Sequence, residues 1–87
     1  MSIKLLVIED DPDGAASVRD AATDAGFDVV VAATGEAGVT AFREQRPALV
    51  LTDLVLPDID GIEVLRRILQ LDRRVPVIMM TAYGTVD

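Results

Sequence analysis

Acidic side chains directly follow two apolar runs of the sequence, and a threonine follows another. Glu9 and Asp10 come after the first run, Asp53 closes a later one, and Thr81 follows the last. Carboxylate and hydroxyl oxygens are suitable ligands for hard cations such as Mg²⁺, Ca²⁺ or Mn²⁺. A carboxylate beside Mg²⁺ can also attack a phosphoryl group and form an aspartyl phosphate. If these side chains meet in the fold, they predict phosphoryl chemistry that depends on a divalent cation.

A cluster of carboxylates needs a counter-charge. Two carboxylates ~4 Å apart repel each other by roughly 4 kcal/mol at an effective dielectric of 20. That is a large share of the stability of a small domain, which is about 5–15 kcal/mol. The chain contains no His and no Cys, so only oxygen ligands are available. Mg²⁺ suits such a set because it binds one or two carboxylates, retains waters and shares the remaining positions with a phosphate.

Each of these residues also has a purely structural interpretation. Asp11 and Asp13 flank Pro12, and acids at such a position commonly cap a helix or interact with its dipole. The pair Glu9 and Asp10 could do the same if it stood alone. A threonine after a strand, as at residue 81, is commonly a turn residue. Only the agreement of three strand ends favours a functional site.

Hydrophobic periodicity predicts four strands that alternate with three helices. Strands are expected over residues 3–8, 27–33, 48–51 and 77–80, and helices over 12–25, 35–46 and 61–71. The strands are short, branched and apolar, as in a parallel sheet that is buried on both faces. The expected apolar stripe of the third helix consists of Ile62, Leu65, Ile68 and Leu69.

This alternation predicts an α/β fold, a flavodoxin-like doubly wound parallel sheet truncated to about four strands, in the order 2-1-3-4, with three helices. Ligands of such sheets bind beyond the carboxyl ends of the strands. Strands 1, 3 and 4 are neighbours in this order. We therefore expect Glu9, Asp10, Asp53 and Thr81 to converge at one edge.

Length, charge and hydropathy argue against several classes of protein. The 87 residues are enough for a single domain, and they carry a net charge of −7. We do not expect such an acidic chain to bind nucleic acid directly, because contacts with phosphates need a cationic protein surface. No apolar run approaches the ~20 residues of a membrane span, and no signal peptide is evident. We expect a cytoplasmic protein with no membrane partner.

The sequence resembles the receiver domains of two-component response regulators over its whole length. Residues 5–11, 51–57 and 80–82 carry the resemblance, together with Asp60 and Gly61. It implies that Asp53 accepts a phosphoryl group from a phospho-His of a sensor histidine kinase. It further implies that Glu9, Asp10, Asp53 and the backbone carbonyl of Val55 hold Mg²⁺.

The resemblance also implies roles for two later residues. Thr81 would hydrogen-bond the phosphoryl group and move on activation, and the Ala82 amide would lie near the phosphoryl oxygens. Residues 81–86 look most like receivers fused to sigma-54-dependent transcription activators. Family receivers assist their own phosphorylation and dephosphorylation, so we do not expect a separate enzyme.

The sequence departs from the family pattern at its end. The domain expected over residues 1–87 lacks the fourth helix, fifth strand and fifth helix of the family, and with them a Lys that pairs with the phosphoryl group. Lys4 is the only Lys, and it belongs at the opposite end of the sheet. Without a fifth strand, residues 77–80 become an exposed sheet edge, which favours a homodimer or higher oligomer through that edge.

Three functions therefore compete. The first is a phosphoacceptor receiver. The second is a truncated receiver fragment that binds Mg²⁺ and self-associates without competent phosphotransfer, and the absent Lys favours it. The third is a phosphatase or phosphotransferase that uses Asp53 catalytically. Such enzymes usually place a second Asp two residues later, where this chain has Val55.

Overall fold

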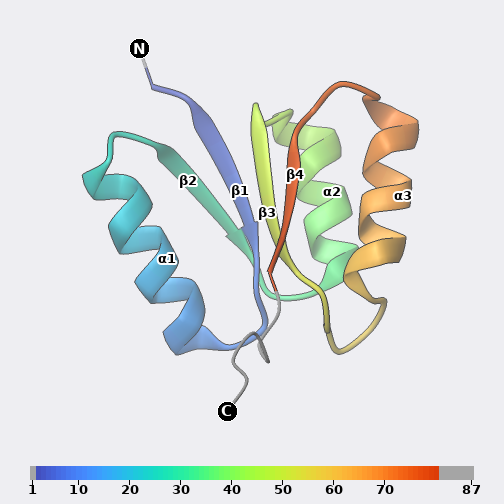
Figure 1. Ribbon diagram of the computed structural model, residues 1–87, viewed down its shortest axis with the longest axis horizontal. Coiled ribbons are helices and arrows are strands. Elements are labelled where there is room, and N and C mark those ends of the chain that lie inside the picture. The colour runs from blue at the N-terminus through green and yellow to red at the C-terminus, as the bar shows by residue number, and fades with distance from the viewer. Residues whose placement is uncertain (1, 81–87) are drawn as a thin grey trace.

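The computed structural model describes residues 2–80, which form a four-stranded sheet with helices on both faces (Figure 1). The elements along the chain are β1 (Lys4–Ile8), α1 (Pro12–Asp24), β2 (Asp28–Ala32), α2 (Gly35–Gln45), β3 (Leu49–Asp53), α3 (Gly61–Leu71) and β4 (Val77–Met80). Every predicted element is present, and its bounds differ from the predicted ones by at most two residues.

All strand pairs are parallel, and the strand order is β2-β1-β3-β4. This confirms the predicted flavodoxin-like topology. The third strand continues past its apolar residues to Asp53, because Thr52 pairs with Met79 and Asp53 pairs with Met80. Asp53 is therefore the last residue of an inner strand, whose backbone is held by neighbours on both sides.

Local side-chain chemistry sets the ends of the helices. Asp11, Thr34 and Asp60 each accept a hydrogen bond from the amide three residues further on, at 3.2, 3.0 and 2.8 Å. These are N-caps, so the structural interpretation of Asp11 is correct. Gly26 follows the end of α1 with a φ of 99°, a left-handed conformation that glycine adopts at little cost.

The main core lies between the sheet and the pair α2 and α3. Its buried members come from the strands, from the two helices and from the connector before β4: Leu6, Ile8, Ala32, Val39, Phe42, Val50, Val64, Ile68 and Val75. The expected stripe of α3 was partly wrong. Val64 and Ile68 are buried, whereas Ile62 is 56% exposed. Val64 and Ile68 are four residues apart and so share the face that meets the sheet, and Ile62 lies off that face.

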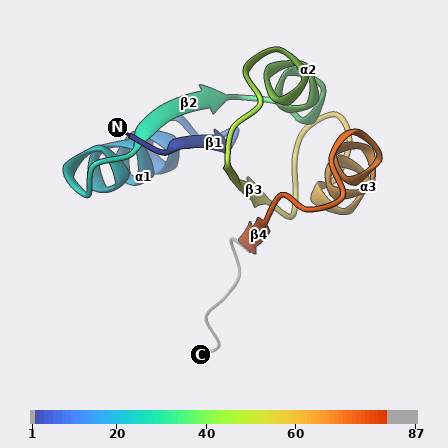
Figure 2. The same cartoon turned by 90° about the horizontal axis from the view of Figure 1, so that it is seen from above.

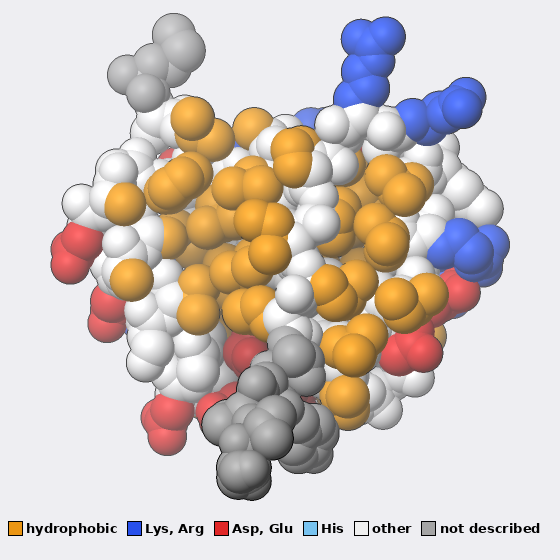
Figure 3. Space-filling model, viewed as in Figure 1, with side chains coloured by type: hydrophobic (Ala, Val, Ile, Leu, Met, Phe, Trp, Pro, Cys, Tyr) orange, Lys and Arg blue, Asp and Glu red, His pale blue; other side chains and the backbone are white. Residues whose placement is uncertain are grey.

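The opposite face of the sheet is only half covered. Figure 2 shows α1 on this face and α2 and α3 on the other. α1 packs on β1 and β2, so the same face of β3 and β4 has no helix over it in the described part of the chain. Ile78 is 50% exposed there, opposite Leu51 in the register. Figure 3 shows hydrophobic side chains gathered over this face.

Candidate functional site

Three carboxylates meet beyond the carboxyl ends of β1 and β3. Glu9 and Asp10 directly follow β1, and Asp53 ends β3, the neighbouring strand. One carboxylate oxygen from each residue lies within 4.8 Å of the other two. The parallel pairing of the two strands brings these side chains together, although more than forty residues separate them in the sequence.

The three carboxylates differ in their exposure to solvent. Asp10 is exposed, Glu9 is half-buried, and Asp53 is 5% exposed. The Oδ1 atom of Asp53 is buried and has no hydrogen-bond partner among the described residues. An unpaired buried carboxylate oxygen is costly, which points to a ligand that the protein itself does not supply.

The protonation of Glu9 reflects this crowding. Burial raises the pKa of Glu9, and the nearby carboxyl groups of Asp53 and Asp10 raise it further. The Asp11 backbone N–H, which donates to Glu9 Oε2 at 3.0 Å, acts in the opposite direction. The net rise in pKa means that the site favours a proton, or another positive charge, over three bare carboxylates.

The loop after Asp53 is held close to the strand ends by backbone contacts. Leu54 donates its amide to the Met80 carbonyl at 2.7 Å, and the Gly61 amide donates to the Leu54 carbonyl at 2.8 Å. A Cβ at position 61 would lie 2.8 Å from the Met79 sulfur and 3.0 Å from Leu54 Cα, and closer still to the Asp53 carbonyl oxygen. Only glycine lets α3 begin this close to the site.

Asp58 also fixes this loop, and its role was missed in the sequence. Its two carboxylate oxygens accept the amides of Gly35 and Glu36, each at 2.8 Å. These bonds to the first turn of α2, that to Glu36 foremost, lower the pKa of Asp58. The residues involved lie more than twenty positions apart, so no local pattern could have indicated the contact.

The structure tests the other predicted site residues less directly. Val55 lies in the loop two residues beyond Asp53, and its side chain is 55% exposed; the role of its carbonyl stays a prediction. Thr81 and Ala82 lie outside the described residues. Lys4 lies at the amino end of β1, where its Nζ donates to Gln45 Oε1 at 3.0 Å, far from the carboxylates.

Together these observations define the class of protein: a doubly wound α/β domain with an acidic site at the carboxyl edge of a parallel sheet. The chain belongs to the response regulator receiver domain family, which matches residues 5–87. The identity that the sequence suggested is therefore confirmed at the level of the family.

Known relatives agree with this assignment. The DNA-binding response regulator MtrA of Mycolicibacterium smegmatis is 44% identical over the whole chain, which spans 38% of that protein. Sporulation initiation phosphotransferase F of Bacillus subtilis is 34% identical, again over the whole chain, which spans 70% of it. The crystal structure of a CheY-like receiver domain from Methanospirillum hungatei superposes with a TM-score of 0.92 at 28% identity, covering 99% of this chain and 69% of the other.

These relatives do not support the expected affinity with sigma-54-dependent activators. That expectation depended on residues 81–86 alone, a short and polar segment, whereas the relatives match along the whole chain. The chain spans about two-fifths of the length of MtrA. No helix in the described range 2–80 is long and apolar enough to cross a bilayer.

Proposed function

We propose that this chain is a phosphoacceptor domain in which Asp53 receives a phosphoryl group from a phospho-His of a sensor kinase. The single observation that carries the proposal is the buried, unpartnered Oδ1 of Asp53 beside two further carboxylates. Family membership supports the same function. So does the name of one relative, a sporulation initiation phosphotransferase.

The chemistry assigned to Asp53 is a displacement at phosphorus. A carboxylate oxygen of Asp53 attacks the phosphorus atom, the bond from phosphorus to the donor imidazole nitrogen breaks, and the imidazole leaves. The product is an aspartyl phosphate. Burial of Asp53 among the strand ends keeps the attacking oxygen in one position. The phospho-His donor must then approach from the exposed side of the site, where Asp10 lies.

We further propose that Glu9, Asp10 and Asp53 hold Mg²⁺ with the carbonyl of Val55. The donor set fits, because all available ligands are oxygens and three of them lie within 4.8 Å of one another. When bound, the cation would offset the charge on the carboxylates and on the transferring phosphoryl oxygens. We also propose that Thr81 hydrogen-bonds the phosphoryl group and that the Ala82 amide lies near the phosphoryl oxygens.

The proposal is for a phosphoacceptor and not for a separate phosphatase. A phosphatase of this chemistry needs a general acid close to the nucleophile. The position two residues after Asp53 carries Val55, whose side chain cannot transfer a proton. Membership of the receiver family also favours phosphotransfer over the alternative of a module that binds Mg²⁺ alone.

The partner surface proposed for self-association is the β4 edge with the half-covered face beside it. β4 is the last strand of the sheet in the described range, and Ile78 projects from it with 50% of its surface exposed. An apolar strand at an edge invites pairing with another chain. We propose that a second copy covers it in a two-fold dimer.

Phosphotransfer is tested by intact-mass measurement after incubation with acetyl phosphate and Mg²⁺. We expect one phosphoryl group on the wild-type chain and none on Asp53→Asn. Asp13→Asn is the matched control, since Asp13 is an exposed acid in the first turn of α1, and it should be labelled like the wild type. Labelling of Asp53→Asn to the wild-type extent would refute the proposal.

A further inference from the structure

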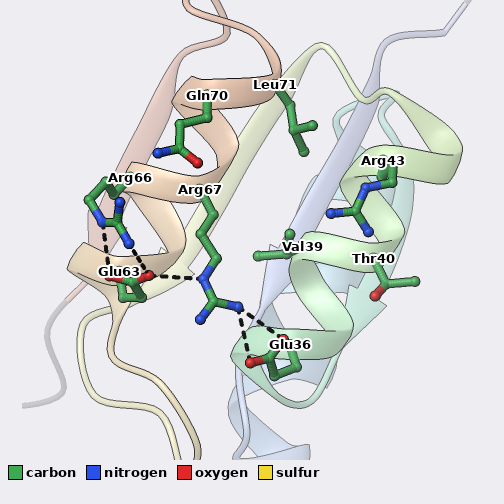
Figure 4. Close-up of a pocket in the computed structure, with 9 residues that line it drawn as sticks. All are labelled: Glu36, Val39, Thr40, Arg43, Glu63, Arg66, Arg67, Gln70 and Leu71. Atoms are coloured by element: carbon green, nitrogen blue, oxygen red, sulfur yellow. Dashed lines mark hydrogen bonds and ion pairs between the residues drawn. The ribbon is translucent and has the colours of Figure 1, made fainter.

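A groove between α2 and α3 lies on the flank of the molecule away from the carboxylate site. Its volume is about 300 Å³, and its lining includes Arg43, Arg66, Arg67, Gln70, Val39 and Leu71. Figure 4 shows these side chains on the two helices that border the groove, with Arg66 on the side of α3 away from α2. The size is at the small end of ligand cavities, which span about 300–1,000 Å³. It suits one or two side chains and not a whole helix.

One end of the groove is already neutralised by ion pairs. Arg67 donates to both oxygens of Glu36, each at 3.0 Å, and to Glu63 at 2.9 Å. Arg66 pairs with the same Glu63 at 2.6 Å. The Arg67–Glu36 pair joins α3 to α2, whereas the two pairs of Glu63 lie within α3. The two glutamates cancel two of the three arginine charges.

Arg43 is the cation left over. It makes no ion pair and no side-chain hydrogen bond with any residue between 2 and 80. It lies on α2, across the groove from Gln70 of α3 (Figure 4). The lining therefore has an excess of one positive charge in a chain whose net charge is −7. A ligand with a single negative charge would balance this excess positive charge.

The rest of the lining consists of two polar residues, Thr40 and Gln70, and two aliphatic ones, Val39 and Leu71. Val39 is 4% exposed and belongs to the core, and Leu71 is half-buried at the end of α3. A ligand that reached Arg43 would thus also touch apolar surface. Arg43 offers the planar fork that binds a carboxylate through two parallel hydrogen bonds.

From this geometry we propose that the α2–α3 groove binds a short acidic peptide segment, with one Asp or Glu carboxylate on Arg43 and an aliphatic neighbour against Leu71. A protein partner supplies that segment. A phosphate group fits less well, because its second charge would face Glu36 and Glu63 without a further free cation. The groove shares no residue with the carboxylate site, so its binding can be measured without phosphotransfer.

The test is a titration of the isotope-labelled chain with the capped tripeptide Leu-Glu-Leu, followed by amide chemical shifts. We expect shifts concentrated at Val39, Arg43, Gln70 and Leu71. The Leu-Gln-Leu analogue and the Arg43→Gln variant should each weaken binding by about fivefold, the upper range for an exposed charge pair. Arg19→Gln is the matched control, because Arg19 is an exposed arginine of α1 outside the groove, and it should bind like the wild type.

Three results would overturn the proposal. The first is a set of shifts scattered over the surface or centred on another element. The second is equal affinity for the Glu and Gln peptides, or for the wild type and Arg43→Gln. The third is tighter binding of inorganic phosphate than of the tripeptide at the same groove, which would assign it to a phosphate ligand instead.

Discussion

At the scale of single residues, the site depends on how differently three similar carboxylates are placed. Asp53 is buried at the end of an inner strand, whereas Asp10 is exposed and Glu9 is half-buried. Burial raises the pKa of Glu9, and the Asp53 charge raises it further. The crowding is therefore a cost to the folded state that a bound cation would relieve.

Binding of Mg²⁺ should stabilise the fold. With a dissociation constant of ~1 mM, ~10 mM Mg²⁺ would raise the free energy of unfolding by about 1.4 kcal/mol. For a domain of this size that corresponds to several degrees in Tm. Thermal melts at matched ionic strength measure it. Asp10→Asn should abolish the shift and Asp13→Asn should retain it; a wild-type Tm indifferent to Mg²⁺ would contradict the assignment.

Gly61 should tolerate no side chain. In Gly61→Ala the added methyl group would press on the Asp53 carbonyl, Leu54 Cα and the Met79 sulfur, and such overpacking costs about 1–3 kcal/mol. Chemical denaturation measures the loss. Ile62→Ala is the neighbouring control, because Ile62 is 56% exposed, and surface changes usually stay within about 0.5 kcal/mol. Equal stabilities of the two variants would show that α3 can shift.

At the scale of elements, contacts between residues distant in sequence hold the site loop in place. Asp58 accepts two amides of α2, and Asp60 caps α3. The Asp60 cap could be predicted, because its partner is three residues away. The Asp58 contact could not, since its partners lie on another helix and an Asp before Ile59 is also typical of an ordinary turn.

The ion pairs that Glu63 makes with Arg66 and Arg67 within α3 should make stability depend on pH in a defined window. Hydrogen bonds from Arg66 and Arg67 lower the pKa of Glu63 to about 2, from an ordinary 4.5. A depressed carboxyl pKa stabilises the fold above the unfolded value, and that stability is lost as the pH falls from 4.5 towards 2.

The variant Glu63→Gln isolates this effect. It should melt below the wild type at pH 7, and the difference in Tm should shrink as the pH falls below 4.5. Glu44→Gln is the control on α2, because Glu44 makes no ion pair within residues 2–80; its difference from the wild type should stay small at every pH. A difference that stayed constant with pH would contradict this prediction, because it could not come from ionisation of Glu63.

At the scale of the whole molecule, the four-stranded order and the convergence of strand ends could be predicted because both depend on topology. Alternating strands and short helices leave few arrangements, and the flavodoxin-like one, expected for so short a chain, places β1 beside β3. Side-chain direction was harder to predict. The whole run 77–80 was expected at the open edge, yet the Met79 sulfur lies near Gly61 at the start of α3, whereas Ile78 is exposed on the open face.

Self-association should accordingly depend on Ile78. The wild-type chain should sediment as a dimer or larger species at high micromolar concentration, because the apolar face of β3 and β4 is uncovered in the described structure. Ile78→Lys should shift it towards the monomer. Val55→Lys is the matched control, since Val55 is as exposed as Ile78 but lies in the loop beyond the strands. A wild-type monomer across the concentration series would contradict the proposed dimer.

The central claim is that Asp53 is the phosphoacceptor, and the most direct measurement is the position of the modified residue. After reaction with acetyl phosphate and Mg²⁺, borohydride reduction converts an acyl phosphate into a stable alcohol, which peptide mass spectrometry can assign to one position. We expect the modification at residue 53 alone. A reduced acid at Glu9, Asp10 or any other position, with residue 53 unmodified, would contradict the account.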